Sequence, residues 1–304
     1  MVTLKESSKT MFELIDTIDV ENTLGEGVTW DTETQTVWWT DIEQKKLFAY
    51  QVTERDLVSF DTPHRLCAFA LTKKSDVLLA AFDCGIALHN LITGECDWLF
   101  KFPGDATVRF NDGRTDAKGR FWVGTLNEDG DKTASSGLYR VDTNMQVTKV
   151  EADVGICNGL AWNTDATRFY MADSSKQIIY QYVFDNDNGA ISDKTPFKQM
   201  EATAAPDGAI MGNDDHLYSA LWGGNCVARI APSGEEQRFD VPVEQPTCVA
   251  FGGEDNDLLF VTSARYALSD ESIADAPQSG SLFIYRTGFK GHHNPRFAGE
   301  TVYD

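Results

Sequence analysis

FWVGT, residues 121–125, belongs to a pattern that returns six times along the chain and decides its fold. Each copy has an apolar residue, then a larger and usually aromatic residue, and a small residue two places further on. The copies are VWWTD (37–41), VLLAA (77–81), FWVGT (121–125), FYMAD (169–173), LYSAL (217–221) and LFVTS (259–263). Their second residues, Trp38, Leu78, Trp122, Tyr170, Tyr218 and Phe260, follow one another at intervals of 40 to 48 residues. A polar or glycine-containing turn precedes each copy, and a further β-rich run follows it. This alternation of turns and short β-rich runs is typical of β-hairpins.

A repeat of about 45 residues with some four strands is typical of one blade of a β-propeller. Helical solenoid repeats of this length would show apolar residues at helical spacing, which the chain lacks. We therefore predict an all-β, six-bladed β-propeller with four-stranded antiparallel blades, formed by residues 1–304 as a single domain. The apolar stretch 11–20 is expected to add the outer strand of the last blade, so that no sheet edge stays open. Residues 269–280 are expected to form a loop within the sixth blade.

Composition limits the partners and the compartment. The 47 acidic and 26 basic residues give a formal charge of −21, which disfavours nucleic acid and anionic membranes as partners and mainly serves solubility. No apolar run reaches the roughly 20 residues of a membrane span, and residues 1–10 lack the pattern of a secretory signal. The six cysteines are dispersed without C-x-x-C spacing, as expected of free thiols. We expect a cytoplasmic protein, a monomer or a weak homo-oligomer.

Polar residues stand at equivalent places in several repeats, about 11 or 12 positions before the aromatic column. In a propeller the first strand of every blade lines the channel, so these positions form a ring in the loops that lead into the innermost strands. The ring consists of Glu26, Leu66, Asn111, Asn158, Asp207 and Cys248. Glycine directly follows Glu26, Asn158 and Asp207, and it allows a sharp turn or a close approach to a ligand. The alternative is that Asn-Gly and Asp-Gly are ordinary turn dipeptides.

A cation would explain this ring, because two converging carboxylates repel each other unless an opposite charge lies between them. An all-oxygen set suits calcium, magnesium or manganese, while zinc and iron(II) in a catalytic role stay open. The loops that follow the second strands open on the same face and carry Glu128 and residues 222–225. Arg109 also belongs there, either as a surface ion-pair partner or as a donor to hydroxyls or a carboxylate.

Five segments resemble the SMP-30/gluconolactonase family, which includes regucalcin and bacterial sugar lactonases. They are LGEGVTW (24–30), RFNDGRTDAKGRFWVGTLNE (109–128), CNGLAW (157–162), APDGAI (205–210) and ALWGG (220–224). The resemblance implies a six-bladed propeller with one divalent metal ion, and it covers residues 24–299. It implies that the metal ligands are Glu26, Asn158 and Asp207, and that the sugar-contacting residues are Arg109, Asn111 and Glu128. Val28 stands where the family usually has proline, a change that affects loop stiffness more than ligand chemistry.

The resemblance implies hydrolysis of a sugar lactone, an aldono-1,4- or 1,5-lactone, to its aldonic acid. The metal would polarise the carbonyl and activate water, and Asp207 is the candidate general base, while a metal-bound hydroxide that acts without such a base stays open. Nucleophilic catalysis is disfavoured, because G-x-S-x-G is missing and the five histidines lie away from the ring. His292 and His293 are adjacent and remain a possible metal pair. Two other functions stay open: a metal-dependent aryl esterase or phosphotriesterase, and a non-catalytic calcium-binding propeller that would have lost the sugar-contacting set. The size of the lactone also stays open.

Overall fold

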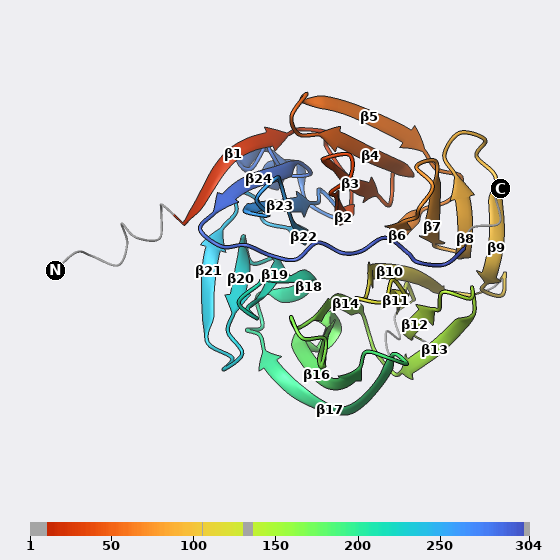
Figure 1. Ribbon diagram of the computed structural model, residues 1–304. Coiled ribbons are helices and arrows are strands. Elements are labelled where there is room, and N and C mark those ends of the chain that lie inside the picture. The colour runs from red at the N-terminus through yellow and green to blue at the C-terminus, as the bar shows by residue number, and fades with distance from the viewer. Residues whose placement is uncertain (1–10, 105, 130–135, 301–304) are drawn as a thin grey trace.

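The computed structural model describes residues 11–104, 106–129 and 136–300, and these residues form 24 strands in six antiparallel sheets of four strands. The sheets are arranged as blades around a central channel (Figure 1), so the predicted six-bladed all-β propeller is confirmed. Residues 1–10, part of the basis for expecting a cytoplasmic protein, lie outside the described residues, as do residues 301–304. Among the described residues, no helix has the length and apolar character needed to cross a bilayer.

Within each blade the strands follow one another from the channel outward. Blade 1 consists of β2 (Gly25–Asp31), β3 (Thr36–Asp41), β4 (Lys46–Gln51) and β5 (Asp56–Asp61). Blade 2 consists of β6 (Leu66–Leu71), β7 (Val77–Phe82), β8 (Gly85–Asn90) and β9 (Cys96–Lys101). Blade 3 consists of β10 (Val108–Thr115), β11 (Phe121–Asn127), β12 (Gly137–Val141) and β13 (Val147–Ala152). Blade 4 consists of β14 (Cys157–Trp162), β15 (Arg168–Asp173), β16 (Ile178–Asp185) and β17 (Ala190–Gln199). Blade 5 consists of β18 (Ala205–Met211), β19 (Leu217–Trp222), β20 (Cys226–Ile230) and β21 (Glu236–Asp240). Blade 6 consists of β22 (Pro246–Gly252), β23 (Leu258–Ser263), β24 (Leu282–Thr287) and β1 (Phe12–Ile18).

The first strand of the chain closes the ring, as predicted. β1 pairs antiparallel with β24, with Phe12 opposite Thr287 and Ile18 opposite Leu282. The last blade therefore contains both ends of the propeller, which covers an edge that would otherwise be open to pairing. The expectation of a plain loop at residues 269–280 is corrected, because this insertion between β23 and β24 contains the short helix α2 (Asp270–Asp275). The Ser269 hydroxyl caps α2 by accepting a hydrogen bond from the Ser272 N–H.

The repeating aromatic column lies on the second strand of every blade and packs between blades. Leu78, Trp122, Tyr170, Tyr218 and Phe260 are buried, and Trp38 is half-buried. The small residues of the repeat permit this packing, because a Cβ added at Gly124 would lie 2.5 Å from the side chain of Cys157 in the next blade. The six cysteines are free thiols, as predicted; Cys84 and Cys96 are half-buried and the others are buried.

A C-terminal segment, residues 288–299, crosses one face of the propeller in front of the inner strands (Figure 1). We call it the C-terminal strap. The Phe297 N–H donates to the Leu71 carbonyl (2.8 Å) and the Ala298 N–H to the Gly119 carbonyl (3.0 Å), while the Phe297 ring is fully buried. The strap thus ties several blades together and covers one end of the channel. The other end is the one at which the ring residues lie.

Candidate functional site

All six site residues predicted from the sequence line one cavity of about 360 Å³, at the end of the channel away from the strap. They are Glu26, Arg109, Asn111, Glu128, Asn158 and Asp207. Trp222, from the loop face predicted with Glu128, also lines this cavity. Ser174 and Tyr266 line it as well and were not expected from the sequence. Residues from five blades therefore converge on a single space.

The ring residues lie within the innermost strands, which corrects the expectation that they lie in the preceding loops. Glu26 is in β2, Asn158 is in β14 and Asp207 is in β18. In each of these strands the pairing register shifts directly at or beside the ring residue. Such a β-bulge adds a residue to one strand and re-aims the side chains next to it. Gly27 and Gly159 make the bulges possible, because their φ angles of 61° and 60° are in the left-handed region.

Burial and mutual repulsion dominate the electrostatics of the two ring carboxyls. Glu26 and Asp207 are only 7% and 5% exposed. Burial, reinforced by the negative charge of Asp112, raises the pKa of Glu26 to about 8. The pKa of Asp207 is raised well above its usual value by burial first and by Glu26 next. Asp207 Oδ1 is buried without a hydrogen-bond partner among the described residues. A divalent cation would satisfy this oxygen and offset the repulsion, so these residues fit a metal with oxygen ligands.

Asn158 is the third member of the set implied to hold a metal. Its side chain is buried, and its amide nitrogen donates to the Ser174 hydroxyl (2.9 Å). This contact orients the Asn158 carbonyl oxygen toward the cavity, where it accepts a hydrogen bond from the Asn111 amide (2.6 Å). A carbonyl oxygen has two lone pairs, so one remains for a cation. The ring residues are therefore joined directly to the residues expected to contact a sugar.

Arg109 organises that second group. Its Nη1 donates to Asn111 Oδ1 (3.0 Å) and to the Phe110 carbonyl (2.8 Å), and its Nε donates to Glu128 Oε1 (3.3 Å). Arg109 and Asn111 are buried, whereas the Glu128 side chain is 43% exposed at the mouth of the cavity. The group thus offers hydrogen-bond donors and acceptors along one wall, with fixed orientations deep inside and a more accessible carboxylate at the rim.

Arg65 is a residue of this rim that the sequence analysis missed. It lies just before β6 and forks onto Glu128, with Nη1–Oε1 and Nη2–Oε2 distances of 2.8 Å each. This fork is the main reason why the pKa of Glu128 is lowered. Arg65 also pairs with Asp83 (2.9 Å) and Glu43 (3.3 Å). The sequence held no signal for it, because the ring member of its blade is the apolar Leu66.

Asp112 and Arg114 were also missed as channel residues. Asp112 is 3% exposed, accepts a hydrogen bond from the Leu160 N–H (3.3 Å), and has a second oxygen without a partner among the described residues. Its charge raises the pKa of both Glu26 and Asp207. Arg114 is buried and donates across the channel to the Val249 carbonyl. The only signal for Asp112 was its place directly after Asn111.

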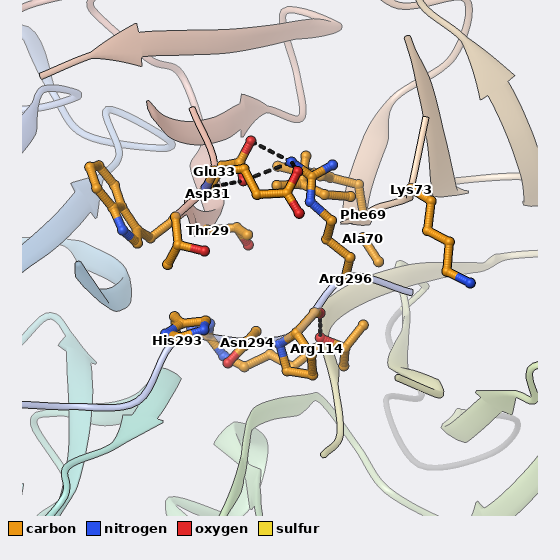
Figure 2. Close-up of a pocket in the computed structure, with 15 residues that line it drawn as sticks. Thr29, Asp31, Glu33, Phe69, Ala70, Lys73, Arg114, His293, Asn294 and Arg296 are labelled. Carbon is orange, nitrogen blue, oxygen red and sulfur yellow. Dashed lines mark hydrogen bonds and ion pairs between the residues drawn. The ribbon is translucent and has the colours of Figure 1, made fainter. Parts of the chain in front are cut away.

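The two adjacent histidines lie at the opposite end of the channel. His292 and His293 are exposed on the strap, and His293 lines a separate cavity of about 340 Å³ (Figure 2). In that cavity Arg296 Nη2 donates to both carboxylate oxygens of Asp31, with distances of 2.7 and 2.8 Å. None of the six predicted site residues lines this second cavity. The histidine pair is therefore separate from the ring carboxylates.

A six-bladed propeller with carboxylates and amides gathered at one end of its channel is the class of protein that these features define. Residues 24–265 match the family model described as "SMP-30/Gluconolactonase/LRE-like region". The chain belongs to this family, which confirms the resemblance found in the sequence.

Three relatives illustrate the similarity. The chain is 35% identical to L-arabinolactonase of Azospirillum brasilense, over 92% of this chain and 94% of that protein. It is also 35% identical to pentonolactonase XacC of Haloferax volcanii, over 88% of this chain and 91% of that protein. Among solved structures it is similar to regucalcin of Agrobacterium tumefaciens, described as a calcium-binding protein, with a TM-score of 0.87, 29% identity, and coverage of 93% and 97%.

Proposed function

We propose that this protein hydrolyses a sugar lactone, an aldono-1,4- or 1,5-lactone, to the aldonic acid and uses one divalent metal ion. The observation that carries the proposal is the convergence of Glu26, Asn158 and Asp207 with Arg109 and Asn111 in one cavity. Relatives named for sugar lactonase activity support it. As two of these names specify five-carbon lactones, pentonolactones are the first substrates to test.

Glu26, Asn158 and Asp207 would hold the ion through oxygen atoms. When bound, it supplies Lewis acidity toward the lactone carbonyl and lowers the pKa of a nearby water. Asp207 would contact the ion through Oδ1, which has no hydrogen-bond partner among the described residues, and its other carboxylate oxygen would take the proton of the attacking water. A bond then forms between the water oxygen and the carbonyl carbon. The ring C–O bond breaks, and its oxygen leaves as a hydroxyl after taking up a proton.

Arg109, Asn111 and Glu128 would orient the sugar hydroxyls. Arg109 and Asn111 are held by hydrogen bonds to each other and to the Phe110 carbonyl, so they lose little freedom when substrate binds. Glu128 is held by Arg65 and Arg109 and still has lone pairs for a hydroxyl donor. Small alkyl esters, aryl esters and phosphotriesters lack the sugar hydroxyls that would pair with the hydrogen-bonding groups of Arg109, Asn111 and Glu128. These residues therefore favour sugar lactones as substrates.

Acid release in a pH-stat tests the proposal, with pentono- and hexonolactones crossed with calcium, zinc, manganese, magnesium and iron(II). Asp207→Ala is expected to abolish the metal-dependent rate, whereas Asn111→Ala should mainly change the preference among lactones. Asp240→Ala, which removes an exposed carboxylate from the outer strand β21, is the matched control and should match the parent. If no lactone releases acid with any metal, the enzyme proposal is wrong. Metal binding without turnover would instead favour a non-catalytic calcium-binding propeller.

A further inference from the structure

We propose that His64, Asp83 and Cys84 form a second metal site, suited to zinc or a similar borderline ion, on the edge of blade 2. One potential ligand atom from each residue lies within 4.8 Å of the other two. They supply one nitrogen, one oxygen and one sulfur, which is a donor set that zinc accepts at bond lengths of about 2.0 to 2.3 Å. The inference goes beyond the proposed function and does not depend on it.

The backbone holds these three residues side by side. Asp83 and Cys84 form the two-residue turn between β7 and β8, where Phe82 pairs with Gly85. The Asp83 N–H donates to the carbonyl of Arg65, which directly follows His64 (2.9 Å). The turn between β7 and β8 is thus joined by a hydrogen bond to the segment that precedes β6. In a tetrahedral zinc site the ligand atoms are about 3.5 Å apart, so side-chain rotations that move these atoms by about 1 Å would bring them to three of the four positions, and water would take the fourth.

Asp83 supplies a second and independent observation. Its Oδ2 accepts from Arg65 Nε (2.9 Å), but its Oδ1 is buried with no hydrogen-bond partner among the described residues. An unsatisfied buried acceptor is costly and usually has a reason, such as an ion that binds there. A cation on Oδ1 would satisfy it without breaking the pair with Arg65.

The His64 ring is already positioned by packing. It meets the rings of Phe82 and Trp98 edge-on, with centroid distances of 5.6 and 5.5 Å. One of its ring nitrogens is the potential ligand atom that lies near Asp83 and Cys84. A ring fixed by its neighbours loses little conformational freedom on binding a metal.

The local charges do not oppose a cation. Three positive groups, Arg65, Arg109 and the Lys101 ammonium near Cys84, face three carboxylates, which belong to Glu43, Asp83 and Glu128. The cluster is therefore neutral when all of these groups are ionised. On metal binding Cys84 would lose its thiol proton to solvent and bind as the thiolate, which adds one negative charge beside the divalent ion.

The donor sets separate this site from the ring. Glu26, Asn158 and Asp207 offer oxygen alone, whereas Cys84 would give a cobalt ion a thiolate ligand. We therefore test the site by titrating the whole chain with Co²⁺ and recording the thiolate-to-cobalt charge-transfer absorption, to which an all-oxygen site contributes nothing. The parent is expected to show this band with saturation by about two equivalents, because the ring would take up one ion without contributing to the band, and His64→Gln should weaken binding by about ten-fold or more.

Two thiol variants decide the outcome. Cys84→Ser should lose the band, whereas Cys96→Ser should keep it. Cys96 is the matched control, because it is the other half-buried thiol of the same blade and contacts His89 Nδ1 (3.3 Å). Absence of the band in the parent, or its survival in Cys84→Ser, would overturn the proposal.

A measurement on the parent protein covers the case in which a variant fails to fold. Alkylation of the thiols followed by peptide mapping should show that Zn²⁺ protects Cys84 and leaves the labelling of Cys96 unchanged. Equal protection of both thiols, or protection of neither, would contradict a site built on Cys84. None of these readouts uses lactone turnover, so failure of this site and failure of the proposed function are distinguishable.

Discussion

Replacing Glu26 by Gln is expected to stabilise the metal-free protein at neutral pH while it weakens metal binding. The pKa of Glu26 is raised from an ordinary 4.5 to about 8, mainly by burial. Between these two values the folded state keeps a proton on this carboxyl that the unfolded state has lost. The free energy of unfolding therefore falls as pH rises through this window, and the Gln variant lacks this loss.

The size of the effect follows from proton linkage. One proton held only by the folded state changes the free energy of unfolding by about 1.4 kcal/mol per pH unit. From about pH 5 to about pH 7, within the window for Glu26, the metal-free parent should lose about 3 kcal/mol more than Glu26→Gln. The raised pKa of Asp207 acts in the same direction in both proteins. In the variant it should act less, because the charge of Glu26 is one of its causes.

Chemical denaturation of the chelator-treated proteins at the two pH values measures this difference. Glu254→Gln, which neutralises an exposed carboxyl between β22 and β23, is the matched control and should follow the parent. Addition of the metal should reverse the order of stabilities, because only the parent has the full ligand set. Equal pH dependence of the parent and Glu26→Gln without metal would refute the reasoning about burial and repulsion.

Three further substitutions test the geometry around the channel. Gly159→Ala should cost about 1 to 3 kcal/mol and weaken metal binding, measured by denaturation and calorimetry, because its φ is 60° and a Cβ would lie 2.8 Å from the Asp207 carbonyl oxygen. Arg65→Met should raise KM more than it lowers kcat in the lactonase assay, with partial rescue in Arg65→Lys, because the fork that positions Glu128 is lost. Arg296→Ala should lower stability by about 1 to 3 kcal/mol in denaturant and leave kcat and KM unchanged, because its ion pair lies at the far end of the channel.

The blades and the convergence of the ring could be predicted from sequence because a propeller repeats its geometry. Equivalent positions of successive repeats lie at the same height around the channel, so the spacing from the aromatic column was sufficient to bring Glu26, Asn158 and Asp207 together. The bulges could not be predicted in this way. A glycine beside a polar residue fits a loop and a bulged strand equally well, and only the register of pairing distinguishes them.

Arg65 shows a different limit. Its partners Glu43, Asp83 and Glu128 belong to blades 1, 2 and 3, and they lie 22, 18 and 63 residues away along the chain. No local pattern encodes such a meeting, because it depends on how neighbouring blades pack. Helix α2, in contrast, had a readable signal. Ser269 is followed by two acidic residues, which is a common start of a helix, but the helix buries none of its residues and so has no apolar face that would distinguish it from a polar loop.

The charges of the channel bear on why the proposed reaction would need a divalent ion. Three buried carboxylates, Glu26, Asp112 and Asp207, face two guanidiniums, Arg109 and Arg114, which together leave one negative charge when all are ionised. Such a site repels hydroxide and disfavours the oxyanion that forms when water adds to a lactone carbonyl. A divalent ion held by Glu26, Asn158 and Asp207 would change the sum from one negative to one positive charge and would supply electrostatic stabilisation of developing negative charge. Burial is the first cause of the raised pKa values of Glu26 and Asp207, and the neighbouring negative charges that add to it are the same charges that a divalent ion would offset.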